Sequence, residues 1–186
     1  MFSLIIIRIS DIFISLTCLV LFFPIFILIS LLIILFSGFP VFYISKRIGY
    51  KGAIFVIYKF RSIKKDIKDE PTSIGKYLRR SSLDELPQLV NILLGEMSIV
   101  GPRPLPPYLE AQIDNKLISI RRFIKPGLTG LSQINFQGNK RTWDDKILLD
   151  IKMIKNYSFF IYIKIIFLTI PVLFKRFFYN KKGKTL

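Results

Sequence analysis

Two adjacent carboxylates, Asp84 and Glu85, are the residues of this chain whose types and spacing best suit chemistry. They lie in the stretch SSLDELPQL, with Arg79 and Arg80 just before it and Arg103 on a proline-rich loop after it. Neighbouring cations favour the ionised form of a carboxyl. An ionised Asp beside a bound phosphate can attack phosphorus as a nucleophile. A carboxylate pair can also hold Mg²⁺ together with phosphate oxygens.

The same two acids also fit the start of a helix. Asp is a favoured N-cap, and acids in a first turn complement the helix dipole. Pro87 is tolerated only in a first turn, and Gly95 ends the helix. We therefore expect Asp84 at or beside the N-cap of a helix. Its apolar face would be formed by Leu86, Leu89, Val90, Leu93 and Leu94. From these residues alone, both capping and catalysis stay open.

The composition excludes several kinds of site. The 186 residues include no His and a single Cys, so imidazole catalysis, disulfides and zinc clusters are not expected. Lys and Arg number 28 against 12 Asp and Glu, a net charge of +16 that suits anionic partners. Hydrophobic residues make up 52% of the chain, which points toward a membrane.

An uncharged apolar segment extends from residue 12 to residue 45. It is long enough for a transmembrane helix, which needs about 20 apolar residues. Pro24 near its middle predicts a kink or break. Arg8 on one side and Lys46 and Arg47 on the other are short basic flanks, which favour the cytoplasmic side at both ends.

Two topologies follow from this segment. A re-entrant helix–break–helix would keep both flanks on one side, with halves of about 12 residues reaching mid-bilayer. A spanning helix with a tolerated proline is the alternative. Arg8 and Asp11 share a helical face and are expected to pair at the surface.

Other elements are predicted from periodicity and turn signals. They are a β-hairpin of residues 41–44 and 54–60 with a basic loop over 46–52, a helix over 108–125, a turn over 126–130, a helix over 143–156, and one or two interfacial helices over 158–179, where Pro171 interrupts the apolar run. The fold class is thus mostly α with a small hairpin (α+β), carried on a monotopic membrane anchor.

Four sequence stretches resemble the bacterial sugar transferase family, the small monotopic phosphoglycosyl transferases. They are KFRS at 59–62, LRRSSLDELPQLVNILLGEMSIVGPRPLPP at 78–107, KPGLTGLSQIN at 125–135 and TWDDKILLDIKMIKN at 142–156. DELPQL followed by SxVGPRP is highly specific. The similarity is to the family's minimal form, without further N-terminal spans.

The resemblance implies an activity. Such enzymes transfer a sugar-1-phosphate from a UDP-sugar to polyprenyl (undecaprenyl) phosphate and release UMP, the first membrane step of surface polysaccharide or glycoconjugate synthesis. It implies that Asp84 is a covalent nucleophile and that Asp84 and Glu85 hold the required Mg²⁺. Candidate phosphate-binding residues are Lys59, Arg61, Arg79, Arg103, Lys140 and Arg141.

The resemblance also implies an organisation. Residues 1–40 would form a re-entrant helix broken at Pro24, 41–157 a catalytic domain on the cytoplasmic face of the bacterial inner membrane, and 158–186 interfacial helices with a basic tail. Anionic lipids are expected partners. The sugar, the glycan and the formation of a homodimer are not decided by the sequence.

Two departures from the family pattern are visible. Phe23 stands where some relatives carry Ser before the membrane proline. The run GLSQINFQGNKR lacks the Trp of the usual GWAQVNGRN and has an extra residue, which blurs whether Lys140 or Arg141 takes the basic role.

Two rival functions are kept. One is a non-catalytic membrane-surface scaffold in which the acids are caps. The other, a nucleic-acid binder, is disfavoured because the basic residues are scattered and no recognition motif is present.

Overall fold

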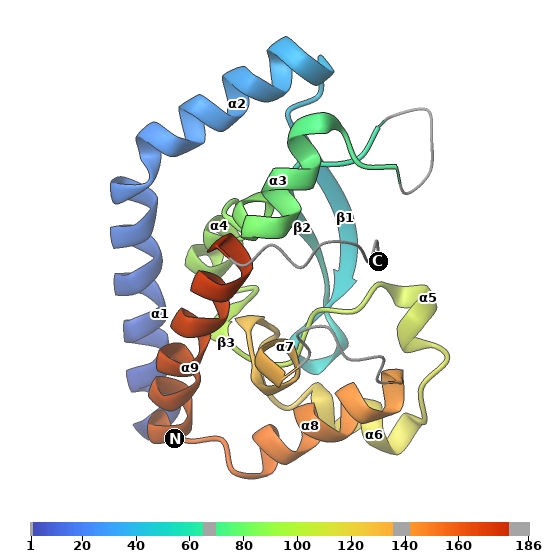
Figure 1. Ribbon diagram of the computed structural model, residues 1–186. Coiled ribbons are helices and arrows are strands. Elements are labelled where there is room, and N and C mark those ends of the chain that lie inside the picture. The colour runs from blue at the N-terminus through green and yellow to red at the C-terminus, as the bar shows by residue number, and fades with distance from the viewer. Residues whose placement is uncertain (1, 65–69, 136–141, 179–186) are drawn as a thin grey trace.

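A computed structural model describes residues 2–64, 70–135 and 142–178 (Figure 1). The elements in chain order are α1 (Phe2–Leu21), α2 (Phe23–Ser37), β1 (Phe42–Ile48), the 3-10 turn η1 (Tyr50–Gly52), β2 (Ile54–Phe60), α3 (Ser73–Ser81), the 3-10 turn η2 (Leu83–Glu85), α4 (Gln88–Leu94), β3 (Ser98–Val100), α5 (Pro107–Glu110), α6 (Asn115–Arg121), β4 (Gly127–Thr129), α7 (Leu131–Asn135), α8 (Trp143–Lys155) and α9 (Phe159–Phe178). The mostly α architecture with a small hairpin is confirmed.

The predicted hairpin is present and longer than expected. β1 pairs antiparallel with β2, with Phe42 opposite Phe60 and Ile48 opposite Ile54. Alternate β2 side chains are buried, as a sheet covered on one face requires. β1 continues through Lys46 and Arg47, which we had assigned to the loop, because the connection is only the short turn η1.

A second, parallel strand pair joins β3 to β4, where the sequence predicted only a turn at 126–130. The pairing depends on two glycines whose backbones approach closely. A Cβ on Gly127 would lie 1.9 Å from the backbone nitrogen of Gly101. The strand was missed because this close contact with a distant glycine leaves no periodic signal in three residues.

The N-terminal apolar segment is two helices that meet at a bend (Figure 1). The break falls at Phe22, and Pro24 lies in the first turn of α2, where a missing backbone N–H costs least. The halves are 20 and 15 residues rather than about 12, because α1 includes the charged residues that precede the apolar run. By length and composition, residues 3–21 could cross a membrane.

Arg8 and Asp11 do not pair at the surface, which corrects our expectation. Arg8 donates to the carbonyl of Leu93 at the end of α4, at 2.8 Å. Asp11 is buried and its Oδ1 accepts from the Ile99 amide on β3 and from the Tyr162 hydroxyl on α9, at 2.8 and 2.9 Å. These partners let two charged groups lie inside an apolar helix and dock it onto the rest of the chain.

One further helix prediction needs correction, and two are settled by the structure. The segment 108–125 is two short helices, α5 and α6, because Asp114 caps α6 by accepting from the Lys116 amide. α9 continues through Pro171 without ending, held on both sides by packing against α1, α3 and α7. The helix expected over 143–156 is confirmed as α8, with a capping box between Thr142 and Asp145.

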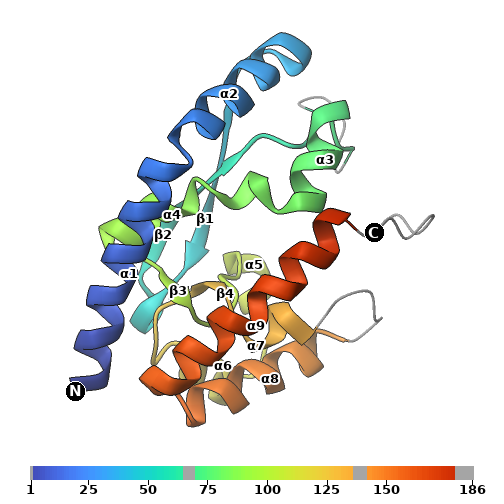
Figure 2. The ribbon, with the colours of Figure 1, turned by 60° about the vertical axis from the view of Figure 1, so that its left-hand side comes forward.

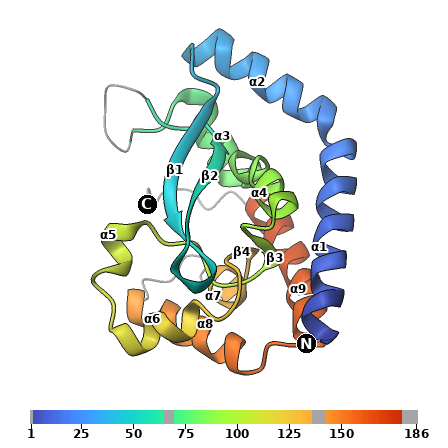
Figure 3. The same ribbon diagram turned by 180° about the vertical axis from the view of Figure 1, so that it is seen from behind.

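Apolar side chains remain exposed along three helices. Figure 2 shows α1 and α2 along one side of the molecule, and the reverse view in Figure 3 shows α9 beside α1. Contiguous exposed apolar surface marks a membrane or partner interface. The exposed residues include Ile9, Phe13, Val20, Phe23, Leu28, Leu35, Phe36, Phe160, Phe167, Phe174 and Phe177.

Candidate active site

The two carboxylates lie in the η2 turn between α3 and α4, not at a helix cap. α4 begins at Gln88, its N-cap position is Pro87, and no side chain caps it. The N-cap prediction for Asp84 is therefore wrong: the 3-10 turn η2, which follows Ser82 in the left-handed region (φ 60°), precedes the helix. Asp84 is 8% exposed, so a carboxyl without a capping role is buried here.

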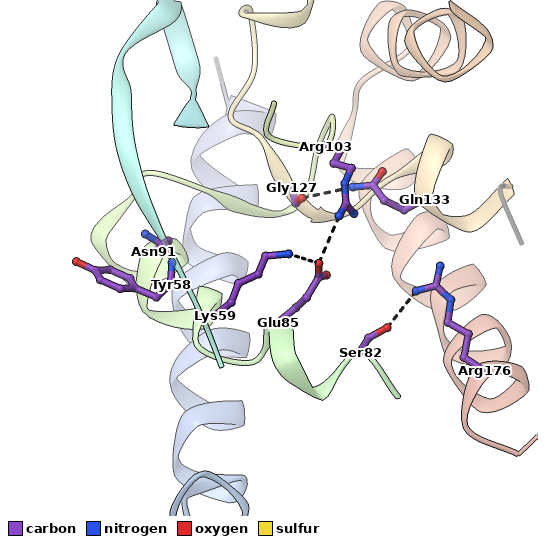
Figure 4. A network of polar contacts seen from close by, with 9 residues as sticks. All are labelled: Tyr58, Lys59, Ser82, Glu85, Asn91, Arg103, Gly127, Gln133 and Arg176. Atoms are coloured by element: carbon purple, nitrogen blue, oxygen red, sulfur yellow. Dashed lines mark hydrogen bonds and ion pairs between the residues drawn. The ribbon is translucent and has the colours of Figure 1, made fainter. Parts of the chain in front are cut away.

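Glu85 is held by two cations from distant parts of the chain (Figure 4). Its Oε1 lies 2.6 Å from Lys59 Nζ on β2 and 3.6 Å from Arg103 Nη2 on the loop after β3. The β2 strand and the proline-rich loop thus converge on η2. This geometry fixes Glu85 beside Asp84 and surrounds the pair with positive charge.

The two carboxyls differ in acidity. Burial, and secondly the charge of Glu85, raise the pKa of Asp84 to about 6, against the opposing effect of Lys59 and Arg79. Burial would also raise the pKa of Glu85, but Lys59 and Arg103 outweigh it and lower that pKa to about 2. With these pKa values both groups are ionised at neutral pH, and Asp84 is the more basic of the two.

A buried ion pair supports the loop that carries Arg103. Arg121 on α6 lies 2.9 Å from Asp150 on α8, and both side chains are almost fully buried. The same Arg121 Nη2 donates to the backbone carbonyl of Arg103 at 2.8 Å. Helices α6 and α8 therefore hold the backbone of the loop, while the Arg103 side chain remains about half exposed and faces Glu85.

Asp150→Ala should destabilise the protein by about 3 kcal/mol, because removing one partner of a buried pair leaves an unpaired charge. The melting temperature in detergent or nanodiscs measures this. Asp150→Asn keeps one acceptor oxygen and should lose less. An unchanged melting temperature for Asp150→Ala would show that the pair does not support the fold.

The profile of the bacterial sugar transferase family matches residues 2–176. The chain belongs to this family. The match covers α1 through most of α9, and therefore both the carboxylates and every element that positions them.

Three relatives show the range of this family. The chain is 42% identical over 147 residues to the uncharacterized sugar transferase EpsL of Bacillus subtilis, covering 72% of this chain and 69% of EpsL. It is 40% identical over 168 residues to an undecaprenyl-phosphate glucose phosphotransferase of Komagataeibacter xylinus, 79% of this chain and 32% of that protein. It is 37% identical over 182 residues to a UDP-glucose:undecaprenyl-phosphate glucose-1-phosphate transferase of Klebsiella pneumoniae, 88% of this chain and 39% of that protein. The chain thus spans well under half the length of two of these relatives.

The remaining predicted phosphate-binding residues of this family member lie in different surroundings. Arg79 is exposed at the end of α3, and its charge acts on Asp84. Arg61 is buried and donates to the carbonyls of Phe39, Ser37 and Gly38, where it holds the end of α2. Lys140 and Arg141 lie outside the described residues.

Sequence reasoning missed two arginines near the pair. The charge of Arg47 on β1 acts on Glu85 and Arg103, and burial lowers the pKa of this guanidinium. The charge of Arg176 on α9 also lowers the pKa of Glu85. The sequence indicated a membrane flank for Arg47 and placed Arg176 only within the segment expected to be interfacial helix. Nothing local to either distinguishes them from surface cations.

The donor set of this family member fits Mg²⁺ in one way only. Within the described residues, no group of three or more His, Cys, Asp and Glu side chains could hold a metal. Mg²⁺, however, is commonly bound by one or two carboxylates plus substrate phosphates. Asp84 and Glu85, which are adjacent and ionised, could supply these two carboxylates.

Proposed function

We propose that this chain transfers a sugar-1-phosphate from a UDP-sugar to undecaprenyl phosphate and releases UMP, starting a surface polysaccharide or glycoconjugate. The observation that carries the proposal is Asp84: a buried, ionised carboxylate that caps no helix and lies beside a Glu85 held by two cations. Family membership and the printed activities of the two phosphotransferase relatives support the choice of substrates.

In the first step, a carboxylate oxygen of Asp84 attacks the phosphorus that carries the sugar. The bond from that phosphorus to the oxygen bridging the two phosphates breaks, and UMP leaves with the electron pair. The product is an acyl phosphate between Asp84 and the sugar phosphate. The pKa of about 6 keeps the nucleophile ionised at pH 7 yet more basic than an ordinary Asp.

In the second step, a phosphate oxygen of the lipid attacks the same phosphorus. The bond between phosphorus and the Asp84 oxygen breaks, and the carboxylate is regenerated while a diphosphate links lipid and sugar. Because UMP leaves before the lipid reacts, one site serves both steps and the kinetics are ping-pong.

Glu85, Lys59 and Arg103 prepare the site for two anionic substrates. Lys59 and Arg103 offset the negative charge that would repel a diphosphate from Asp84. Mg²⁺ would be held by Asp84 and Glu85 with substrate phosphates, and would neutralise charge on those phosphates when bound.

Membrane placement completes the proposal. The α1–α2 pair would enter the cytoplasmic leaflet and return as a re-entrant helix, and the net charge of +16 would favour anionic lipid. Single cysteines placed at Ser3 and at Lys51, in a Cys18→Ser background, should both be labelled from the cytoplasmic side. Labelling from opposite sides would indicate a spanning helix.

The test of the function is UMP release by purified protein in nanodiscs with undecaprenyl phosphate, Mg²⁺ and a panel of UDP-sugars. At least one sugar should give lipid-dependent turnover. Absence of UMP with every sugar, from folded protein, would favour the membrane-surface scaffold.

A further inference from the structure

The last turn of α9 reaches the turn that carries the carboxylates. Arg176 Nη1 donates to the Ser82 hydroxyl at 3.0 Å, two residues before Asp84 (Figure 4). Arg80 on α3 donates back to the Arg176 carbonyl at 3.4 Å, so the end of α9 is tied to α3 and to the residue that precedes η2. A helix from the far end of the chain thus brings a guanidinium into the site.

The guanidinium has more capacity than this contact uses. Arg carries five N–H donors in a planar fork that matches phosphate oxygens. Among the described residues, Arg176 uses one of them, toward a neutral hydroxyl. Its side chain is partly exposed, and its charge is felt by Glu85. A bond to Ser82 alone needs no cation, whereas an arriving phosphate does.

The helix that carries Arg176 also exposes apolar side chains, which suits contact with lipid. Its neighbours in the last turns, Phe174, Phe177 and Phe178, are 62%, 56% and 68% exposed. Lys59 and Arg103, by comparison, come from the hairpin and from a loop of the catalytic domain. An anion that is anchored in the bilayer would approach along α9, and Arg176 is the cation that lies between that helix and η2.

We propose that Arg176 binds the phosphate of the lipid acceptor and positions it for attack on the phosphosugar held by Asp84. This inference rests on the proposed function and names a residue for its second step. Arg176 contacts the incoming phosphate. The attacking oxygen, the phosphorus and the departing Asp84 carboxylate are those of the second step above.

The test compares Arg176→Gln with Lys175→Gln, which removes a neighbouring exposed charge from the same helix. Each variant is measured in two reactions. Exchange of labelled UMP into the UDP-sugar, without lipid acceptor, reports the first step. Full transfer at varied undecaprenyl phosphate reports the second step and its KM.

Arg176→Gln should raise the KM for undecaprenyl phosphate roughly tenfold or more, since a hydrogen bond to a charged group is lost. UMP exchange should stay within about twofold of wild type, and Lys175→Gln should resemble wild type in both reactions, because an exposed charge contributes little. Arg176→Lys should recover part of the lipid affinity because it keeps the charge.

Two results would overturn the inference. If Arg176→Gln slows UMP exchange as much as full transfer, Arg176 serves the nucleotide or the fold rather than the lipid. If it matches Lys175→Gln throughout, Arg176 has no role in the site. Either result leaves the proposed function standing, since wild-type UMP release tests that separately.

Discussion

Asp84→Asn should reduce sugar-phosphate transfer by at least about 10⁴-fold, the order of loss seen when a covalent nucleophile is removed. The amide keeps the shape of the side chain but cannot form the acyl phosphate. UMP release and UMP exchange should fall together, because both depend on the first step. This loss is measured as the rate of UMP release in nanodiscs at saturating UDP-sugar.

The control is Asp144→Asn, an exposed acid in the first turn of α8. It should retain wild-type activity. An active Asp84→Asn variant would remove Asp84 from the chemistry and leave the pair without a function.

Asp84→Asn should also stabilise the metal-free protein at neutral pH. The pKa of Asp84 is about 6 in the folded chain against an ordinary value of 3.8. A raised carboxyl pKa means that wild type loses stability as the pH rises from about 4 to about 6, by about 3 kcal/mol in all. Asn does not titrate. With chelator present, the melting temperature of Asp84→Asn should therefore exceed that of wild type by more at pH 7.5 than at pH 4.5. An equal difference at the two pH values would contradict the raised pKa.

Asp11→Ala should destabilise the fold by about 3–5 kcal/mol, because three donors lose a buried acceptor. Oδ1 of Asp11 accepts from the Ser98 hydroxyl at 3.0 Å, the Ile99 amide at 2.8 Å and the Tyr162 hydroxyl at 2.9 Å. These bonds join α1, β3 and α9. Their loss should loosen both helices, α1 and α9, and lower the melting temperature by the largest amount among the variants considered.

Asp11→Asn is the matched variant, since its amide oxygen can still accept from the Ile99 amide. It should lose less than half as much stability as Asp11→Ala. Equal, small losses for both would show that α1 is held by apolar contacts such as those of Ile7 rather than by the carboxylate.

The sequence predicted best where local chemistry decides the structure. The β-prone residues of 54–60 predicted β2, and the amphipathic pattern of 143–156 predicted α8. The break near Pro24 followed from a missing backbone donor. Arg103 was expected near the pair from its place on the proline-rich loop, whereas Lys59 was named as a candidate only through family resemblance.

Predictions failed mainly where contacts between residues far apart in the sequence determine the structure. Asp84 lies in η2, with two residues between it and the N-cap position of α4 at Pro87. The η2 turn forms after Ser82, which takes a left-handed conformation that serine rarely adopts. Asp11 is buried because β3 and α9, far along the chain, provide its donors. Arg176 enters the site for the same kind of reason: its partner Ser82 lies 94 residues away.

The most direct measurement of the central claim is the mass of the intact protein after mixing with a reactive UDP-sugar and Mg²⁺ in the absence of lipid acceptor. The account predicts a mass increase of one phosphosugar, mapped by peptide analysis to Asp84 and lost when undecaprenyl phosphate is added. UMP release without any adduct, or an adduct on a different residue, would contradict it.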